Sequence, residues 1–365
     1  MVDLTSVASA RDFAGVLDAL TETFGEDAAL FAIDHAFDRM VEVRSTPGAT
    51  TSFPLDGAMR AAMLENRPFV EDDLHWIPIS DREHPVLVVR ASPANLPSDE
   101  VVQLLGPITN AHRARFEDLE RVRRRSSMSV AAEMQWASLP NRADLLGQYA
   151  IGSVLEPAYE VAGDAFDYAT TDGALFAYSL DGMGHGVAAT MASVLALSAI
   201  RNTRRSGGGL AAQMNAASAV LFEEFAGDCF VTGLAVRIDA SGIEFVNAGH
   251  EPAWAVEGGE ARCLDLTAEL PLGVIADHAY GVQAGRALEP GDGIAMFSDG
   301  PANARSSDGS EFGSDRLHEA LEDRWSTSPL RTAHGVVDDV IGFIQDERVS
   351  DDITAVVIRR VTSDR

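Results

Sequence analysis

Four aspartates beside strand-like apolar runs are the residues of this sequence whose type and spacing best fit a chemical role. Each carboxylate lies at the edge of its run, where a strand would deliver it to one rim of a sheet. The four are Asp164, Asp181, Asp299 and Asp351. Carboxylate oxygens without paired histidines or cysteines are typical ligands of Mg²⁺ and Mn²⁺. Two such ions about 4 Å apart can clamp the oxygens of an in-line displacement, so the pattern predicts a site for phosphoester hydrolysis.

Each acidic position, taken alone, also fits a simpler explanation. Asp-Gly is a common dipeptide of hairpin turns, and we interpret Asp172-Gly173 and Asp308-Gly309 as turns. Glycine also follows Asp181 and Asp299 and precedes Asp164, where it would let the backbone approach whatever the carboxylate holds. The ordered set with its flanking residues therefore supports a functional site, whereas no single position does.

Six short motifs follow one another between about residues 135 and 359, which is more than half of the chain. They are Gly163-Asp164-Ala165-Phe166-Asp167-Tyr168, Asp181-Gly182-Met183-Gly184-His185-Gly186, Asn247-Ala248-Gly249-His250-Glu251-Pro252, Leu270-Pro271-Leu272-Gly273, Ser298-Asp299-Gly300 and Ser350-Asp351-Asp352-Ile353-Thr354. Their order resembles the SpoIIE/RsbU-like branch of the metal-dependent PPM (protein phosphatase 2C-like) serine/threonine phosphatases.

The resemblance implies an enzyme that hydrolyses phosphoserine or phosphothreonine in proteins with two Mn²⁺ or Mg²⁺ ions. Asp164 and Asp181 would bridge the two ions and would be the catalytic residues. The backbone carbonyl of Gly182 would bind one ion, and Asp299 and Asp351 would bind the other. The resemblance further implies that a metal-bridged hydroxide attacks phosphorus directly, without a phosphoenzyme.

Three other residues have less defined roles. Asp352 is expected in the second coordination shell, because it lies beside the ligand position of Asp351. In the eukaryotic branch a histidine follows the Asp-Gly pair, but here that position is Met183. His185, two residues further on, is a second candidate for this second shell and stays open between a general acid and a loop histidine. His250 is expected to shape its loop and not to bind metal.

The chain divides into a sensor-like domain (1–97) that resembles GAF domains, a helical linker (98–138) and the phosphatase-like domain (139–365). Apolar patterns predict strands at 28–33, 40–44, 75–79, 86–90, 175–180, 231–238, 243–246, 253–256, 294–298 and 353–358, and helices at 57–65, 187–201, 210–225 and 328–345. Strands and helices in separate runs indicate an α+β fold. The resemblance implies a sandwich of two antiparallel sheets flanked by helices, preceded by a small α/β domain.

Composition excludes several classes of protein. The 56 acidic and 28 basic residues give a net charge of −28, which argues against nucleic-acid and membrane partners. All basic residues are arginine, so lysine nucleophiles, Schiff bases and P-loop lysines are excluded. Two distant cysteines argue against a disulfide framework or a zinc-cysteine site. With no apolar span or signal peptide, the sequence predicts a cytoplasmic protein.

The predicted partners follow from the resemblance and from the linker. Family analogy suggests a phosphorylated anti-sigma-factor antagonist as the substrate, in a partner-switching pathway. The apolar stripe of the linker predicts packing against a partner helix, and so a homodimer. Rotation or bending of this linker is expected to transmit the state of the sensor-like domain to the catalytic domain. A small-molecule ligand of the first domain stays open, because Trp76, Phe53 and Phe69 fit a core as well as a cage. The alternative function is a catalytically inactive docking module, although retention of all four aspartates argues against it.

Overall fold

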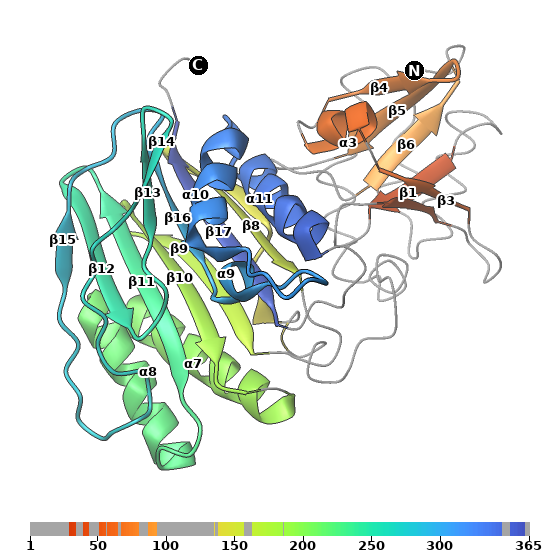
Figure 1. The fold of residues 1–365 in the computed structure, drawn as a ribbon. Helices are drawn as coiled ribbons and strands as arrows, with labels where there is room; N and C mark the ends of the chain where they lie inside the picture. The colour runs from red at the N-terminus through yellow and green to blue at the C-terminus, as the bar shows by residue number, and fades with distance from the viewer. Residues whose placement is uncertain are drawn as a thin grey trace, which may run out of the picture. The chain divides into compact units, whose positions relative to one another are not determined.

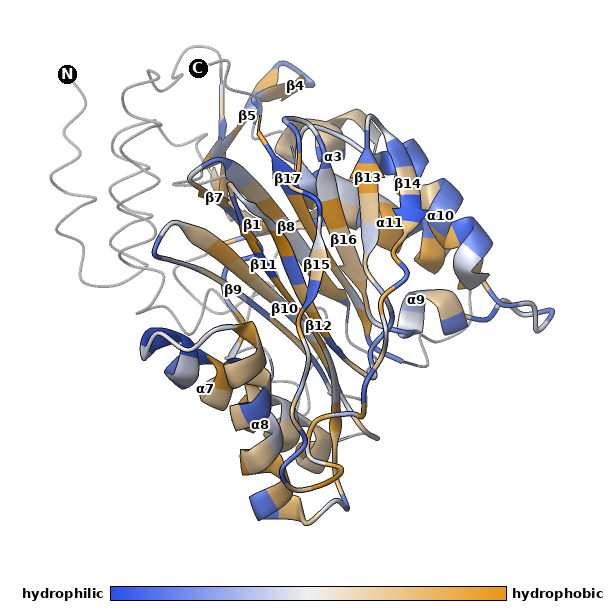
Figure 2. Cartoon of the chain, turned by 90° about the vertical axis from the view of Figure 1, so that its left-hand side faces the viewer, coloured by the Kyte–Doolittle hydropathy of each residue, from blue (hydrophilic) through white to orange (hydrophobic). Residues whose placement is uncertain are grey.

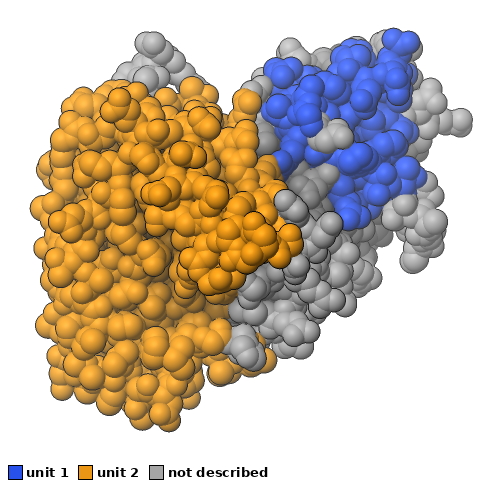
Figure 3. Space-filling model, in the orientation of Figure 1, with its two compact units in different colours: residues 1–127 blue, residues 128–365 orange. Residues whose placement is uncertain are grey.

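The structure, a computed structural model, divides the chain into two compact units, Met1–Ser127 and Met128–Arg365 (Figure 3). It describes residues 29–33, 39–43, 51–55, 57–64, 67–79, 87–92, 135, 138–156, 163–184, 186–344 and 351–361. Most of the predicted linker, 98–138, and His185 lie outside the described residues. The predicted linker, and the domain boundaries at 97 and 138, therefore stay predictions.

The described part of the first unit is a six-stranded antiparallel sheet in the order β3-β2-β1-β6-β5-β4. The strands predicted at 28–33, 40–44, 75–79 and 86–90 are present, whereas β3 and β4 were too short to predict. The elements are β1 (Ala29–Ile33), β2 (Arg39–Glu42), β3 (Ser52–Pro54), helix α3 (Gly57–Leu64), β4 (Phe69–Glu71), β5 (Leu74–Ile79) and β6 (Leu87–Ala91). A GAF-like identity of this unit stays a prediction.

Two antiparallel sheets form the second unit (Figure 1), which confirms the predicted α+β sandwich. The first sheet has the order β15-β12-β11-β10-β9 and the second has the order β14-β13-β16-β17-β8-β7. The strands are β7 (Ala143–Leu146), β8 (Tyr149–Glu156), β9 (Asp164–Thr171), β10 (Ala174–Gly182), β11 (Val231–Asp239), β12 (Gly242–Ala248), β13 (Trp254–Glu257), β14 (Glu260–Cys263), β15 (Gln283–Gly285), β16 (Gly293–Phe297) and β17 (Ile353–Arg360).

Helices cover the outer faces of both sheets, as Figure 1 shows. On the first sheet lie α7 (Val187–Arg205) and α8 (Leu210–Phe225). On the second sheet lie α10 (Gly313–Arg324) and α11 (Pro329–Ile344), and the short α9 (Gly300–Asn303) follows β16. The second unit is therefore layered helix, sheet, sheet, helix around the apolar faces of the strands (Figure 2).

Alternation along β10 shows which face of the first sheet carries the candidate site. Phe176, Tyr178 and Leu180 belong to the core beneath α7 and α8, whereas Leu175 and Ala177 belong to the core between the two sheets. Because successive side chains of a strand point to opposite faces, Ser179 and Asp181 continue the inner face. Asp181 is therefore presented toward the second sheet, at the end of the sandwich.

Strand β9 was not predicted, because its sequence interrupts the apolar pattern with acidic residues. Asp167 lies on the helix-covered face and is only 3% exposed. Its carboxylate pairs with Arg201 at 2.8 Å and with Arg204 at 3.3 Å, both from α7. These buried ion pairs tie α7 to β9, and they explain how a carboxylate is tolerated inside the helix–sheet layer.

Candidate metal centre

Asp164 and Asp181 lie directly opposite each other in the antiparallel pair β9–β10. Opposed residues of such a pair share a face and have Cβ atoms about 4.5–5.5 Å apart. The hairpin closes at Asp172-Gly173, where both residues have positive φ, 51° and 79°. Two central residues of positive φ define a type I′ turn, which supports the interpretation of this Asp-Gly as a turn. A tight hairpin thus brings the two predicted bridging carboxylates together.

Asp299 and Asp351 reach the same end of the sandwich from the second sheet. Asp299 lies two residues after β16, Asp351 lies two residues before β17, and these strands are neighbours. Ser298 Oγ accepts a hydrogen bond from the Thr354 amide at 3.0 Å, which holds the two strand ends together. The Asn303 side-chain amide donates to Asp299 Oδ2 at 3.0 Å and so orients that carboxylate.

The acidic groups of the two sheets are close enough to interact electrostatically with one another. Burial, and then the charges of Asp299, Asp351 and Asp352, raise the pKa of Asp181 to about 7. Burial, and then Asp181 and Asp352, hold the pKa of Asp164 well above its usual range. Burial and the charge of Asp299 raise the pKa of Asp351. Within the described ranges, no three His, Cys, Asp or Glu side chains form a ready-made ligand cluster.

The carboxylate of Asp164 is held by residues that the sequence did not single out for this role. Thr354 of β17 donates its hydroxyl to Asp164 Oδ2 at 2.5 Å. Thr354, like Val356 and Ile358, lies on the inner face of β17, so this hydrogen bond crosses from one sheet to the other. The Ser-Asp-Asp-Ile-Thr motif contained this threonine, but its partner lies 190 residues earlier in the chain.

Asp352 faces the backbone that carries Asp164 and not the space between the carboxylates. Its Oδ2 accepts hydrogen bonds from the amides of Gly163 and Asp164 at 3.2 and 3.3 Å, and from Gln135 Nε2 at 3.0 Å. Gln135 Nε2 also donates to the backbone carbonyl of Asp164 at 2.6 Å. This position fits the second-shell role predicted for Asp352. Gln135 was missed, because a single glutamine in a helical pattern carries no signal.

The glycines beside the aspartates serve to bring the site segments close to one another. A Cβ on Gly163 would lie 2.6 Å from the Gly182 carbonyl oxygen, and one on Gly300 would lie 2.1 Å from the Asp352 carbonyl oxygen. A Cβ on Gly182 would lie 2.8 Å from the Ala189 carbonyl oxygen. Backbone–backbone approach therefore requires glycine here, and the interpretation that these glycines also let the backbone approach whatever the carboxylate holds stays a prediction.

His250 is a buried loop residue in the described structure. Its Nδ1 donates to the Glu251 carbonyl at 2.9 Å, so its Nε2 is left to accept from the Ser179 hydroxyl at 3.1 Å. Burial lowers the pKa of His250, although the charge of Asp299 opposes this shift. A neutral imidazole bonded at both nitrogens has no lone pair free for a cation, in keeping with the loop-shaping role predicted for it.

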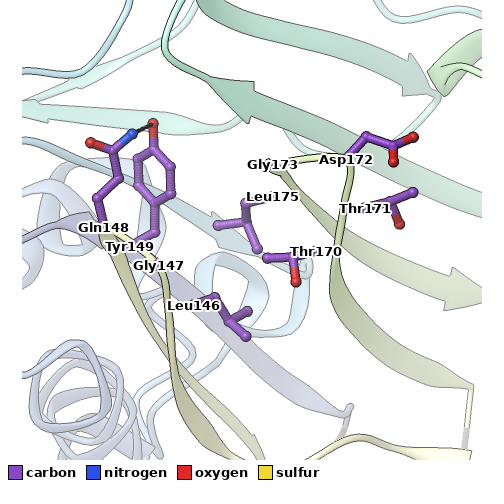
Figure 4. A pocket seen from close by; sticks show the side chains of 9 residues that line it. All are labelled: Leu146, Gly147, Gln148, Tyr149, Thr170, Thr171, Asp172, Gly173 and Leu175. Carbon is purple, nitrogen blue, oxygen red and sulfur yellow. Dashed lines mark hydrogen bonds between the residues drawn. The ribbon is translucent and has the colours of Figure 1, made fainter.

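A cavity of about 480 Å³ lies at the opposite end of the strands (Figure 4). It is lined by the two hairpin turns β7–β8 and β9–β10, through Leu146, Gly147, Gln148, Tyr149, Thr170, Thr171, Asp172, Gly173 and Leu175. Strand β9 begins at Asp164, beside the other carboxylates, and ends at Thr171, in the cavity wall. The cavity therefore has no part in the candidate metal centre.

A two-sheet sandwich with carboxylates at one end is the architecture of the PPM, or protein phosphatase 2C-like, class of serine/threonine phosphatases, and this chain has it. A family model described as Stage II sporulation protein E (SpoIIE) matches residues 171–361. Because this match covers just over half of the 365 residues, the chain belongs to the SpoIIE family. Among the described helices, none is both long and apolar enough to cross a membrane.

Known proteins share this architecture at modest sequence identity. Phosphoserine phosphatase RsbU of Bacillus subtilis (strain 168) is 25% identical over 239 residues, which cover 65% of this chain and 70% of that protein. The SiaA-PP2C domain of Pseudomonas aeruginosa superposes with a TM-score of 0.55 at 23% identity, covering 63% of this chain and 94% of that one. The RsbU and RsbW domains of Rv1364c from Mycobacterium tuberculosis give 0.51 at 22% identity, covering 58% and 60%.

Proposed function

We propose that Asp164, Asp181, Asp299 and Asp351, with the Gly182 carbonyl, hold two divalent cations, Mn²⁺ or Mg²⁺, and that the site hydrolyses phosphoserine or phosphothreonine in a protein. The observation that carries this proposal is the direct opposition of Asp164 and Asp181 across the hairpin, facing two carboxylates of the other sheet. Hard oxygen donors fit these cations. Burial first, and then the neighbouring carboxylates, raise the pKa of Asp164 and of Asp181, and divalent cations would offset the mutual repulsion of these carboxylates.

The chain's own residues would orient the ligands in this proposal. Thr354 fixes Asp164 from across the sandwich, and Asp352 with Gln135 holds the backbone at Asp164. Asn303 steadies Asp299. When bound, the cations would lower the pKa of a water ligand and neutralise charge on the phosphoryl oxygens.

The substrate in our proposal is a phosphorylated anti-sigma-factor antagonist of a partner-switching pathway. Its support is the family membership and the relative named phosphoserine phosphatase RsbU. The strongly negative net charge also favours a protein substrate over a nucleic acid, because the chain as a whole repels polyanions.

A metal-dependent activity assay separates this proposal from the alternative, an inactive docking module. The full-length protein is incubated with p-nitrophenyl phosphate and with phosphorylated antagonists of the host bacterium, with and without Mn²⁺. We expect Mn²⁺-dependent release of phosphate from both kinds of substrate. Absence of turnover on every substrate at saturating Mn²⁺ would leave the docking module as the better description.

A small-molecule ligand of the first unit also remains a proposal. Phe31, Phe53 and Trp76 form an aromatic cluster with ring centroids 5.1–5.6 Å apart, and the Arg90 guanidinium lies 5.3 Å from the Phe31 centroid. Trp76 Nε1 and Arg90 Nε are buried without a hydrogen-bond acceptor in the described structure. Because buried donors are nearly always satisfied, an acceptor-bearing ligand fits this position. A thermal-shift screen on the full-length protein, with the Trp76→Phe variant as control, tests this.

A further inference from the structure

An exposed apolar stripe begins beside the candidate metal centre. Met183 lies two residues after Asp181 and is 43% exposed, and Val187 and Met191 of α7 are 49% and 46% exposed. The amide of Met183 donates to the Phe230 carbonyl at 2.9 Å, which fixes the chain as it leaves β10. Helical residues four apart lie on one face, so Val187 and Met191 are neighbours on the surface of the helix. We call Met183, Val187 and Met191 the α7 stripe.

Among the residues that the structure describes, the packing of α7 on its sheet does not use the α7 stripe. The opposite face of α7 lies on the first sheet and is already buried, through Ala189, Ala192, Ser193, Ala196, Leu197 and Ile200. Further along this face, Leu195, four residues after Met191, is half-buried against the core, and beyond it Ser198 and Asn202 are exposed and polar. Exposure of large apolar side chains is therefore confined to the part of the face beside the centre.

The stripe also lies in an unusually uncharged segment. Residues 182–200 contain no aspartate, glutamate, lysine or arginine, in a chain in which 23% of residues are charged. The net charge of the whole chain is −28, so most of its surface would repel a phosphorylated, negatively charged partner. A neutral apolar surface next to the centre removes that repulsion where a phosphoryl group must approach.

We propose that the α7 stripe docks a folded phosphoprotein substrate through an uncharged apolar surface beside its phosphorylated residue. This inference rests on the proposed phosphatase function and names what would recognise the substrate. A phosphoryl group at Asp181 brings its carrier protein within side-chain reach of Met183 and Val187. Methionine is flexible and polarizable, so Met183 and Met191 can adapt to an apolar partner surface.

The test uses the double variant Val187→Gln/Met191→Gln of the full-length protein. Glutamine favours helix as strongly as methionine and more than valine, so α7 is preserved. The matched control is Leu145→Gln, because Leu145 is also apolar and 40% exposed but lies in β7, near the other end of the sandwich. Each protein is assayed with Mn²⁺ on a folded phosphorylated antagonist, on a short phosphoserine peptide from its phosphorylation site, and on p-nitrophenyl phosphate.

We expect the double variant to lower kcat/KM for the folded antagonist about tenfold, which corresponds to about 1.4 kcal/mol. Turnover of the peptide and of p-nitrophenyl phosphate should stay within about twofold of the wild type, because neither small substrate spans the stripe. The Leu145→Gln variant should match the wild type on all three substrates.

Three outcomes would overturn the docking inference. One is an unchanged kcat/KM of the double variant for the folded antagonist. Another is that the wild-type protein hydrolyses the peptide but none of the folded antagonists, since the stripe would then have no folded partner. The third is dissociation of a homodimer by the double substitution in sedimentation, which would assign the stripe to a second copy of this chain. Failure of the wild type on every substrate would instead reject the phosphatase function itself.

Discussion

The partly buried carboxylate of Asp181 interacts electrostatically with three other carboxylates. Asp299, Asp351 and Asp352 all raise its pKa, and they come from the opposite sheet. Without cations this arrangement costs free energy, because like charges in a site of low solvent access repel one another strongly. The fold therefore holds these carboxylates together against their mutual repulsion, as is expected of a site that binds cations.

The first prediction concerns the charge at the centre. We expect Asp181→Asn and Asp299→Asn to lower Mn²⁺-dependent phosphatase activity by at least about a hundredfold, because each removes a ligand charge but keeps the volume. The control is Asp172→Asn, which should be silent, since asparagine also tolerates the left-handed conformation found at the β9–β10 turn. Circular dichroism and activity assays check this, and wild-type activity in both site variants would show that the assignment of metal ligands is wrong.

The second prediction concerns pH and the metal-free protein. The pKa of Asp181 is about 7 in the folded chain and 3.8 when unperturbed, so the folded state binds this proton more tightly than the unfolded state. The contribution of Asp181 to stability is therefore fully present below about pH 4 and is lost as the pH rises through 7. In the presence of a chelator, Tm should fall between pH 5 and pH 8.

The variant Asp181→Asn isolates this effect from the other titrating groups. Asparagine carries no charge, so the decrease in Tm between pH 5 and pH 8 in the metal-free protein should be smaller than in the wild type. Equal decreases in both metal-free proteins would mean that Asp181 is not electrostatically destabilised.

The sequence was sufficient to place the carboxylates but not the groups that hold them. The order of the motifs singled out Asp164, Asp181, Asp299 and Asp351, and the structure brings all four to one end of the sandwich. By contrast, Gln135 bonds to Asp352 across 217 residues of chain. Such a contact leaves no trace in local spacing, and so it could be found only in the folded molecule.

At the scale of elements, strands with a long apolar run were predicted, whereas β8 is buried over seven consecutive residues and was missed, because Gly152 and Ser153 interrupt its apolar run. Strand β17, Ile353–Arg360, is buried over six consecutive residues and was predicted to within two residues at its end. Strand β9 was missed because Asp167 is stabilised by two arginines of α7, which come more than thirty residues later. Helix α10 was also missed, because only Leu317, Ala320 and Leu321 are buried in it and the rest of it is polar.

The third prediction concerns the crossing of α9 and the segment before β17. We expect Gly300→Ala to destabilise the protein by about 1–3 kcal/mol or more and to lower activity, because its Cβ would lie 2.1 Å from the Asp352 carbonyl oxygen. The control is Gly342→Ala in α11, where the Cβ meets nothing within 4 Å. That variant should gain about 0.4–1 kcal/mol from reduced entropy of the unfolded chain.

Chemical denaturation of the two glycine variants measures both free energies of unfolding. If Gly300→Ala were as stable and as active as the wild type, the close approach of these two segments would not be required for the site.

At the scale of the whole molecule, Gln135 connects the predicted linker with the candidate centre. It lies near the end of the segment 98–138, and its side-chain amide donates to the Asp164 carbonyl and to the Asp352 carboxylate. A shift of the backbone at Gln135 would therefore change the support of Asp164 directly. The contact lies within the second unit, and transmission of the state of the first unit through the linker stays a prediction.

The fourth prediction is a homodimer formed through the linker. Apolar residues at helical spacing, among them Leu104, Leu105 and Ile108, should pack against the same segment of a second copy. Sedimentation velocity at tens of micromolar should show a dimer, and Leu104→Glu/Leu105→Glu should shift it to monomer. The control is Glu117→Gln on the predicted exposed face. A wild-type protein that sediments as a monomer would rule out this assembly.

The opposition of Asp164 and Asp181 also limits how related sequences can differ in length. The 16 residues from 165 to 180 form two strand segments of equal length that end at one two-residue turn. Loss of one residue from each strand would keep the pair opposed but rotate it to the helix-covered face. Unless the turn itself changes, the number of residues between the two aspartates should therefore differ among related proteins only by multiples of four. This gives an alignment rule that can be read from homologous sequences alone.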